Sequence, residues 1–199
     1  MKFRIFAAIL ILFILPSAAA AEMTPAQTLE KIVASLKANP GIAGIADFVH
    51  WQTAFEQMPA PQLKEMGISS PEDLKKFYIE AQNDPGAIIR RQMKQRGLPA
   101  EQAQMMEQHI AAMSTQLKQR MDEQHTKIKR TTFEIGEASV NGSEAKIPLT
   151  TSVDGKQKED VVTLRKYGNE WLLPGLAFLE STGDKAAAAG GAPAGMPQH

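Results

Sequence analysis

Residues 131–174 decide the fold, and they read TTFEIGEASVNGSEAKIPLTTSVDGKQKEDVVTLRKYGNEWLLP. Apolar and polar residues alternate along this stretch, which is typical of strands with one buried face. Three two-residue turn signals interrupt the alternation, at Asn141-Gly142, Asp154-Gly155 and Gly168-Asn169. Three tight turns between alternating segments predict a four-stranded antiparallel meander.

The second and third turns align apolar residues without any adjustment. The second turn places Ile147 opposite Val162, and the third places Leu164 opposite Leu173. Pro148 disagrees with this arrangement, because it lies in an interior strand and a proline cannot donate to a ladder. We therefore expect a local kink there, with Pro148 pointing away from the core.

The first turn requires one extra residue. A β-bulge at Gly136-Glu137 brings Ile135 opposite Ile147 and Phe133 opposite Leu149. The predicted apolar face then consists of Phe133, Ile135, Ala138, Ala145, Ile147, Leu149, Val162, Leu164, Trp171 and Leu173. A sheet with one apolar face needs a cover, so the sequence predicts an α+β fold with the preceding helices packed on that face.

The segment before the sheet predicts about five helices. Thr24-Pro25 and Ser70-Pro71 each supply a capping residue followed by a proline at the first helical position. We expect helices over 24–39, over 42–58, in a short turn closed by Gly67, over 70–83, in a segment ended by Gly97, and over 99–127. Residues 22–182 therefore form one domain, helical over 22–130 and a sheet over 131–182.

The two ends of the chain differ from this domain in composition. Residues 1–21 combine Lys2 and Arg4 with the uncharged run Ile5–Leu15 and a small-residue cleavage region, which predicts a secretory signal cut before Ala21 or Glu22. An uncleaved membrane anchor is the alternative, although the run is short for a bilayer. Residues 183–199 are rich in Ala, Gly and Pro and predict a flexible tail. The expected location is the periplasm or the exterior, without a lipid-anchoring cysteine.

Four short runs carry a resemblance to a known family: FEIG at 133–136, VNGSEA at 140–145, VVTLRK at 161–166 and GNEW at 168–171. They resemble the C-terminal strands of exported bacterial domains of the nuclear transport factor 2-like superfamily. The resemblance implies a cone-shaped α+β domain, and the helical half departs from the usual three helices. Members similar to ketosteroid isomerase keep a carboxylate base inside the cone.

Composition and motifs argue against most enzymatic chemistry. The chain has no cysteine, so thiol chemistry is excluded. Its 22 basic residues balance 22 acidic ones, so no net positive charge attracts nucleic acid. The predicted apolar face carries no Asp, Glu, His or Tyr, and common catalytic motifs are absent. We therefore expect a non-catalytic envelope module without a cofactor. It would hold a small apolar ligand or a protein partner between helices and sheet, or act structurally; an unrecognised hydrolase or isomerase is the contrasting hypothesis.

Two features of the helical half suggest other ligands. Met105, His109, Met113, Met121 and His125 follow four-residue steps on the long helix, and thioether and imidazole groups together suit Cu(I) or Ag(I). Ordinary core packing is the alternative, because Met113 and Met121 also fall on the predicted apolar stripe of that helix. The basic cluster of Arg90, Arg91, Lys94 and Arg96 could meet anionic lipid or a cell-wall polymer, or could form a solvated helix face.

Overall fold

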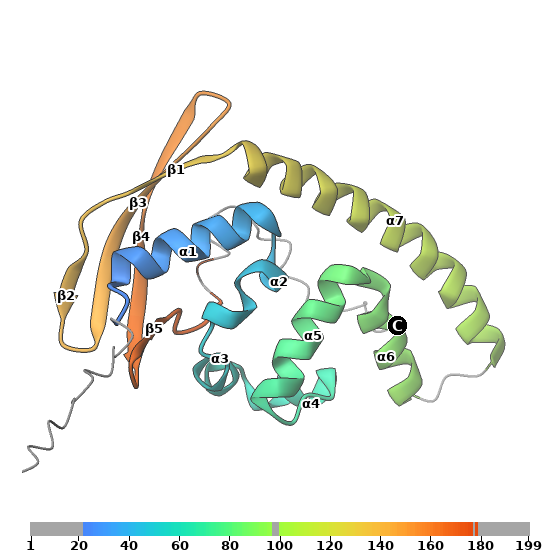
Figure 1. Ribbon diagram of the computed structural model, residues 1–199. Helices are drawn as coiled ribbons and strands as arrows, with labels where there is room; N and C mark the ends of the chain where they lie inside the picture. Colours follow the sequence, from blue (N-terminus) through green and yellow to red (C-terminus); the bar gives the residue numbers. More distant parts are fainter. Residues whose placement is uncertain (1–21, 97–99, 177, 179–199) are drawn as a thin grey trace, which may run out of the picture.

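The computed structural model describes residues 22–96, 100–176 and 178. The predicted signal peptide and the predicted tail over 183–199 lie outside the described residues. The helices are α1 Pro25–Ala38, α2 Ile42–Ile45, the 3-10 helix η1 Ala46–Phe48, α3 Trp51–Gln57, α4 Ala60–Met66, α5 Pro71–Asn83, α6 Pro85–Arg96 and α7 Ala100–Arg130. The strands are β1 Thr132–Ile135, β2 Ser139–Asn141, β3 Glu144–Val153, β4 Lys156–Tyr167 and β5 Glu170–Leu172 (Figure 1). The α+β class is confirmed, with more helices than the five or so expected.

The sheet is the predicted antiparallel meander. Its order is β1-β3-β4-β5, and β2 pairs with the same edge of β3 as β1, so β1 and β2 are two halves of one edge strand. The predicted partners Ile147 and Val162 lie opposite each other. Asp154 and Gly155 both have positive φ angles, of 51° and 74°, as a type I′ hairpin turn requires.

The edge strand pairs in a different register from the predicted one. Ile135 lies opposite Leu149 rather than Ile147. Phe133 lies opposite Thr151. The cause is the turn, because Asn141 pairs with Glu144 and the turn residues are therefore 142 and 143.

This slide leaves the predicted face intact. The edge strand moves by two residues relative to β3, and side chains alternate between faces with a period of two, so each side chain stays on its predicted side. Seven of the ten predicted residues are buried in the core, and three are half-buried against it: Ala145, Ile147, Leu149, Val162, Leu164, Trp171 and Leu173, then Phe133, Ile135 and Ala138. The predicted apolar face is confirmed.

The predicted bulge explains how Pro148 fits in β3. Residues 136–138 separate β1 from β2, and the Gly136 amide donates to the Pro148 carbonyl at 2.8 Å. In an antiparallel ladder the nitrogen and the carbonyl of one residue face the same neighbour. The Pro148 nitrogen, which has no hydrogen, therefore faces the interruption between β1 and β2, where a ladder bond is already lost.

The prediction of one continuous helix over 42–58 is wrong. The helical conformation ends after η1, because the Phe48 carbonyl accepts from the Leu173 amide at 2.8 Å and the His50 amide donates to the Leu173 carbonyl at 2.9 Å. These bonds add Val49 beside the end of the sheet as an isolated parallel bridge. A new helix, α3, then starts with His50 as its N-cap.

Helices α1 and α5 start at their predicted capping residues. Thr24 and Gln27 form a capping box at the start of α1, and the Ser70 hydroxyl accepts from the Asp73 amide at 3.1 Å at the start of α5. Gly67 closes α4 in a left-handed conformation, at φ 64°. The long helix α7 ends at Arg130, three residues beyond the predicted 127.

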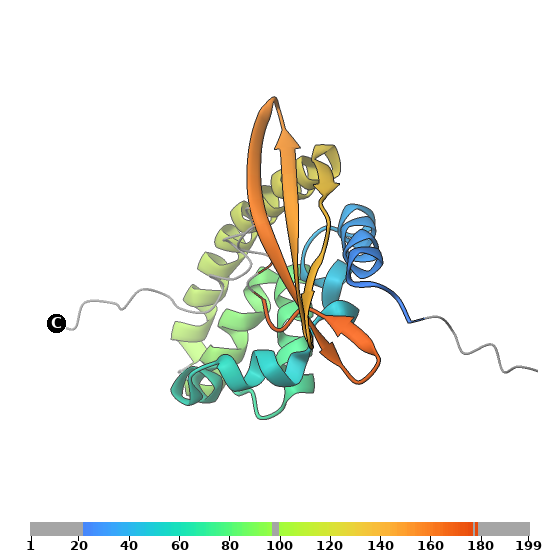
Figure 2. The same cartoon turned by 90° about the vertical axis from the view of Figure 1, so that its left-hand side faces the viewer.

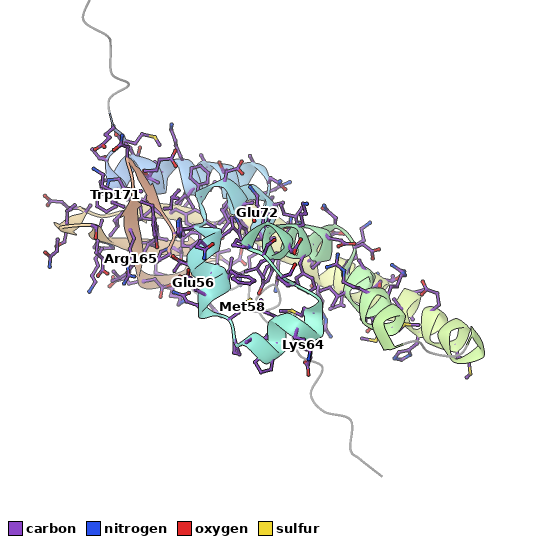
Figure 3. All side chains as sticks on the ribbon, turned by 90° about the horizontal axis from the view of Figure 1, so that it is seen from below. Glu56, Met58, Lys64, Glu72, Arg165 and Trp171 are labelled. Atoms are coloured by element: carbon purple, nitrogen blue, oxygen red, sulfur yellow. The ribbon has the colours of Figure 1, made fainter. Side chains whose placement is uncertain are left out.

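The helices form a layer on one side of the sheet, and they differ in how near to it they lie. Helix α1 runs along the inner face of the sheet, and α5, α6 and much of α7 lie farther away (Figure 1). Seen from below, α6 and α7 extend beyond the rest of the molecule on the side opposite to the sheet (Figure 3). We call α6 and α7 the arm, and we call the sheet with α1 to α5 the body.

Candidate functional site

The space between α1 and the sheet is filled by side chains. Leu29, Ile32 and Leu36 of α1 are fully buried, and so are Ile147 and Leu164 of the sheet. All five belong to one continuous apolar cluster. Apolar burial of this kind stabilises the fold, and it occupies the position where a ligand between helices and sheet was expected.

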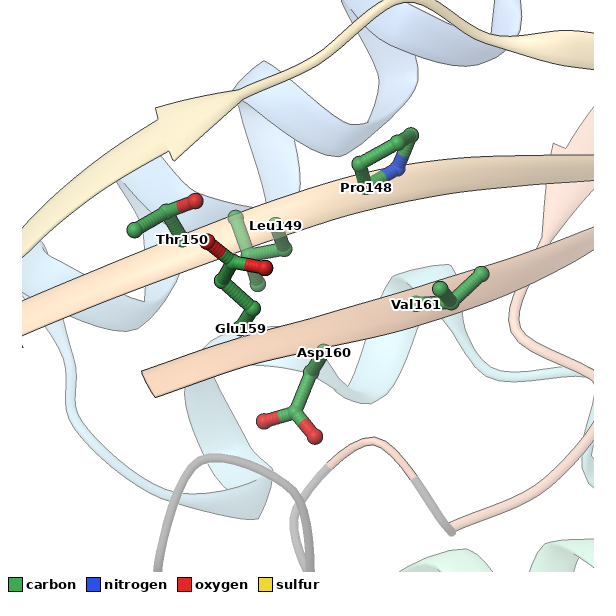
Figure 4. A pocket seen from close by; sticks show the side chains of 6 residues that line it. All are labelled: Pro148, Leu149, Thr150, Glu159, Asp160 and Val161. Atoms are coloured by element: carbon green, nitrogen blue, oxygen red, sulfur yellow. The ribbon is translucent and has the colours of Figure 1, made fainter. Parts of the chain in front are cut away.

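The outer face of the sheet is open by comparison. No helix of the described part of the chain covers it when the molecule is viewed from the sheet side (Figure 2). A hollow of about 470 Å³ lies over β3 and β4. Its six lining residues are Pro148, Leu149, Thr150, Glu159, Asp160 and Val161 (Figure 4).

The register of β3 and β4 builds this hollow from three consecutive pairs. Pro148 lies opposite Val161, Leu149 opposite Asp160 and Thr150 opposite Glu159, as the pairing of the two strands requires. At one end of the hollow, Val161 is 62% exposed and lies opposite Pro148, which is also exposed. All the lining comes from two neighbouring strands, so the hollow is a shallow surface rather than an enclosed cleft.

The charged groups of the hollow do not form an acid–base pair. Asp160 forms an ion pair with Lys158, with Nζ and Oδ2 2.7 Å apart. Glu159 is exposed on the outer face beside Thr150. General acid–base catalysis needs two groups of different proton affinity around one enclosed reacting atom. Asp160 lies opposite Leu149, so its side chain belongs to the inner face of the sheet, and Glu159 is the carboxylate of the open face. A single exposed carboxylate on an open surface suits contact with another surface.

A polar junction that sequence reasoning missed joins α3 to the end of β4. The rings of His50 and Tyr167 are stacked, with centroids 3.5 Å apart and planes 5° apart. The Thr53 hydroxyl lies 2.8 Å from His50 Nδ1 and 3.1 Å from the Tyr167 hydroxyl. The sequence alone carries no signal for this junction, because His50 and Tyr167 are distant along the chain and the broken helix brings them together.

The junction has a structural explanation. His50 Nδ1 accepts from the Thr53 backbone amide at 3.3 Å, so this imidazole nitrogen caps α3. The Thr53 hydroxyl links the cap to Tyr167, which fixes the helix against the β4–β5 hairpin. These polar groups satisfy one another, as polar groups at a packed interface generally do.

The long helix separates the five predicted metal ligands into two groups. Met105 and Met113 are 67% and 38% exposed, and His109 is exposed between them. Met121 and His125 are half-buried. An α-helix rises 1.5 Å per residue, so about 18 Å separates His109 from Met121 along the axis. The five residues do not form one site, and the expectation that Met113 is a core residue is wrong.

Part of the basic cluster is engaged inside the molecule. Arg90 pairs with Asp84 and Glu107, each at 2.7 Å, and Arg91 pairs with Glu80 at 3.0 Å. The hydrogen bond to Glu107 raises the pKa of the Arg90 guanidinium. The side chains of Lys94 and Arg96 lie outside the described part of the helix. The two described arginines therefore join α5, α6 and α7 to one another.

No family, curated protein or solved structure matches this chain. No helix in the described ranges combines the length and the apolar character needed to cross a bilayer. Among the same residues, no group of three His, Asp or Glu side chains is arranged to hold a metal ion. The resemblance to nuclear transport factor 2-like domains stays a prediction.

Proposed function

We propose that the chain is a non-catalytic exported module that binds a protein partner through the outer face of its sheet. The observation that carries this proposal is the contrast between the two sheet faces. Helix α1 packs on the inner face, whereas no described helix covers the outer face (Figure 2). Pro148 and Val161 are exposed there (Figure 4). A solvent-facing valine beside a proline on an uncovered sheet supplies apolar area that a partner can bury.

The shape of this face favours a macromolecule over a small ligand. Small-molecule sites are concave and bury most of the ligand surface. The hollow over β3 and β4 is lined by two adjacent strands only, so it offers a broad contact rather than an enclosure. A protein partner lying across the strands makes use of such a surface, and a purely structural role is the other outcome of the test.

Photo-crosslinking tests the proposal. A photo-reactive amino acid replaces Glu159, which lines the hollow and is exposed. In cells that carry the full chain, we expect irradiation to yield one adduct of discrete mass. In a separate control variant, the same photo-reactive amino acid replaces Lys118, which is exposed on α7. We expect this variant to give no such adduct.

Two exposed valines provide the matched control variants. Val161 lies in the hollow and Val140 lies on β2, and they are 62% and 53% exposed. Neither substitution disturbs the core, so the two variants can be compared directly. We expect Val161→Lys to abolish the adduct, because Val161 lines the hollow, and Val140→Lys to leave it unchanged. Equal adduct formation in both variants, or turnover of a small substrate by the purified chain, contradicts the proposal.

The export part of the proposal rests on residues 1–21. A secretory signal is removed on export, so the mature chain should begin at Ala21 or Glu22. Mass spectrometry of the chain from fractionated cells measures this directly. An intact N-terminus, with the chain in the cytoplasmic fraction, is the contrary result.

A further inference from the structure

One side of the arm presents sulfur and imidazole groups to solvent. Helix α7 packs on α6 through Ile110, which is 1% exposed, and the Arg90–Glu107 ion pair joins the two helices. Met105, His109 and Met113 occupy successive turns of α7 and are all exposed. Methionines that serve packing are mostly buried, so packing does not account for Met105, and it covers Met113 only in part.

The spacing of these residues allows shared coordination. Residues four apart on a helix are neighbours, with Cβ atoms about 5–6 Å apart. His109 therefore has one methionine a turn before it and another a turn after it. The flexible methionine side chain can lean along the helix toward the imidazole from either direction.

We propose that Met105, His109 and Met113 bind one soft monovalent ion, Cu(I) or Ag(I), on the exposed face of α7. The imidazole nitrogen is the central ligand, and the thioethers complete the site from the two adjacent turns. Thioether ligands select soft ions, whereas Mg²⁺ and Ca²⁺ require oxygen ligands. Glu107 does not turn this site into an oxygen-rich one, because residues two apart on a helix do not face each other and its carboxylate is held by Arg90 at 2.7 Å.

Met121 and His125 repeat the spacing without sharing the environment. Both are half-buried, and successive residues on a helix are separated by about 100° around its axis. Met121 is therefore rotated by about 80° from Met113, toward the side that carries Ile110 and Ile128. We assign the ion to the exposed three residues, and this site is independent of the partner surface on the sheet.

The test uses the mature full-length chain with Ag(I) as the first probe. Ag(I) is diamagnetic, so NMR of ¹³C-labelled methionine methyl groups can follow each methionine separately. We expect the methyl signals of Met105 and Met113 and the ring signals of His109 to shift on titration. The methyl signals of Met58 and Met66, which belong to the body, should remain in place.

Competition with a Cu(I) chelator then measures affinity in two variants. Met105→Leu/His109→Gln/Met113→Leu removes the proposed ligands and should weaken Cu(I) binding at least tenfold, because even loss of an outer partner of a ligand costs about tenfold. Met121→Leu/His125→Gln is the matched control at the same spacing and should leave the Cu(I) affinity unchanged, because neither residue belongs to the proposed site. Circular dichroism confirms that both variants fold. Equal loss of affinity in the two variants, or shifts confined to Met121, would overturn the proposal.

Discussion

The body and the arm lie next to each other and both contain helices, but different interactions stabilise them. In the body, side chains from α1, α2, α5 and the sheet form one cluster in which many members are fully buried. In the arm, Ile128 near the end of α7 belongs to this cluster and Ile88 of α6 packs against it, whereas Ile110 is buried outside it. Exposed ion pairs around Arg90 add further contacts in the outer part of the arm. Ion pairs at a solvated surface contribute little to stability.

This contrast indicates that helix formation in α7 depends more on local sequence than strand formation in the body does. Helix α7 consists mainly of residues with high helix propensity, such as Ala, Gln, Met, Glu, Lys and Arg. The strands of the body form because one face is buried, which requires α1 to be in place. We therefore expect local opening to cost least in the part of the arm that lies away from Ile128, and unfolding of the body to be global.

The largest expected effect tests this division directly. Ile147→Ala removes a fully buried side chain from β3 and should lower the free energy of unfolding by about 2–5 kcal/mol. Urea denaturation followed by circular dichroism measures it. The matched variant Ile110→Ala deletes an equally buried isoleucine from the arm.

Hydrogen exchange separates the two outcomes. For Ile110→Ala, we expect faster exchange of amides in α6 and α7, with the β3 and β4 amides unchanged. For Ile147→Ala, exchange should rise throughout the body. Uniform acceleration by both variants would mean that the arm and the body unfold together, and the comparison would fail.

The next effect concerns the bulge in the edge strand. A Cβ at Gly136 would lie 3.0 Å from the Pro148 Cβ and 3.3 Å from its carbonyl oxygen. Gly136→Ala should therefore cost about 1–3 kcal/mol of unfolding free energy through overpacking. In a Pro148→Gly background the cost of the same change should fall, since part of the clash is removed. A cost that is identical in both backgrounds contradicts this explanation.

A smaller effect is expected at the polar junction between α3 and the β4–β5 hairpin. Thr53→Val keeps the shape but removes the hydroxyl that lies between His50 and Tyr167. We expect a loss of about 0.5–1.5 kcal/mol in the free energy of unfolding. The matched change Thr126→Val removes an exposed hydroxyl in α7 that bonds only within its own helix, and its effect should be smaller. Equal losses would show that Thr53 does not link the two elements.

The smallest effect is a pH dependence at the start of α5. The Ser69 hydroxyl and backbone amide donate to Asp73, and these bonds hold the pKa of that carboxyl below its ordinary value of 3.8. A carboxyl with a lowered pKa stabilises the folded state above its unfolded pKa, and this contribution is lost as the pH falls through the folded value. The difference in stability between the natural chain and Asp73→Asn should be present at neutral pH and vanish in acid. A difference that persists at pH 2 would assign it to another cause.

The sheet was largely predictable because its information is local. Turn residues at Asp154-Gly155 and alternation along β3 and β4 specified the central pairings, and the bulge followed from one misaligned residue. The first turn was misplaced because Asn141-Gly142 and Gly142-Ser143 both resemble turn pairs. The error kept the correct face, since a slide of two residues preserves the alternation.

The candidate sites were predicted less well, for a different reason. Whether Met113 is packed or exposed depends on where α6 lies, and the helix pattern placed it on the apolar stripe. The expected ligand space between helices and sheet is filled, because the volumes of side chains from α1 and β3 complement each other only in three dimensions. Pairing of Phe48 and His50 with Leu173, which breaks the expected helix, likewise joins distant segments.

The sequence alone therefore determined the α+β class, the starts of α1 and α5, the central hairpin and the ten residues of the apolar face. Each follows from periodicity, capping or turn chemistry, which act over a few residues. Only the tertiary structure decided which face of the sheet stays open, that the expected helix is interrupted at Val49, and which methionines of α7 reach solvent. Those outcomes depend on contacts between segments far apart in the chain, and a local pattern does not contain them.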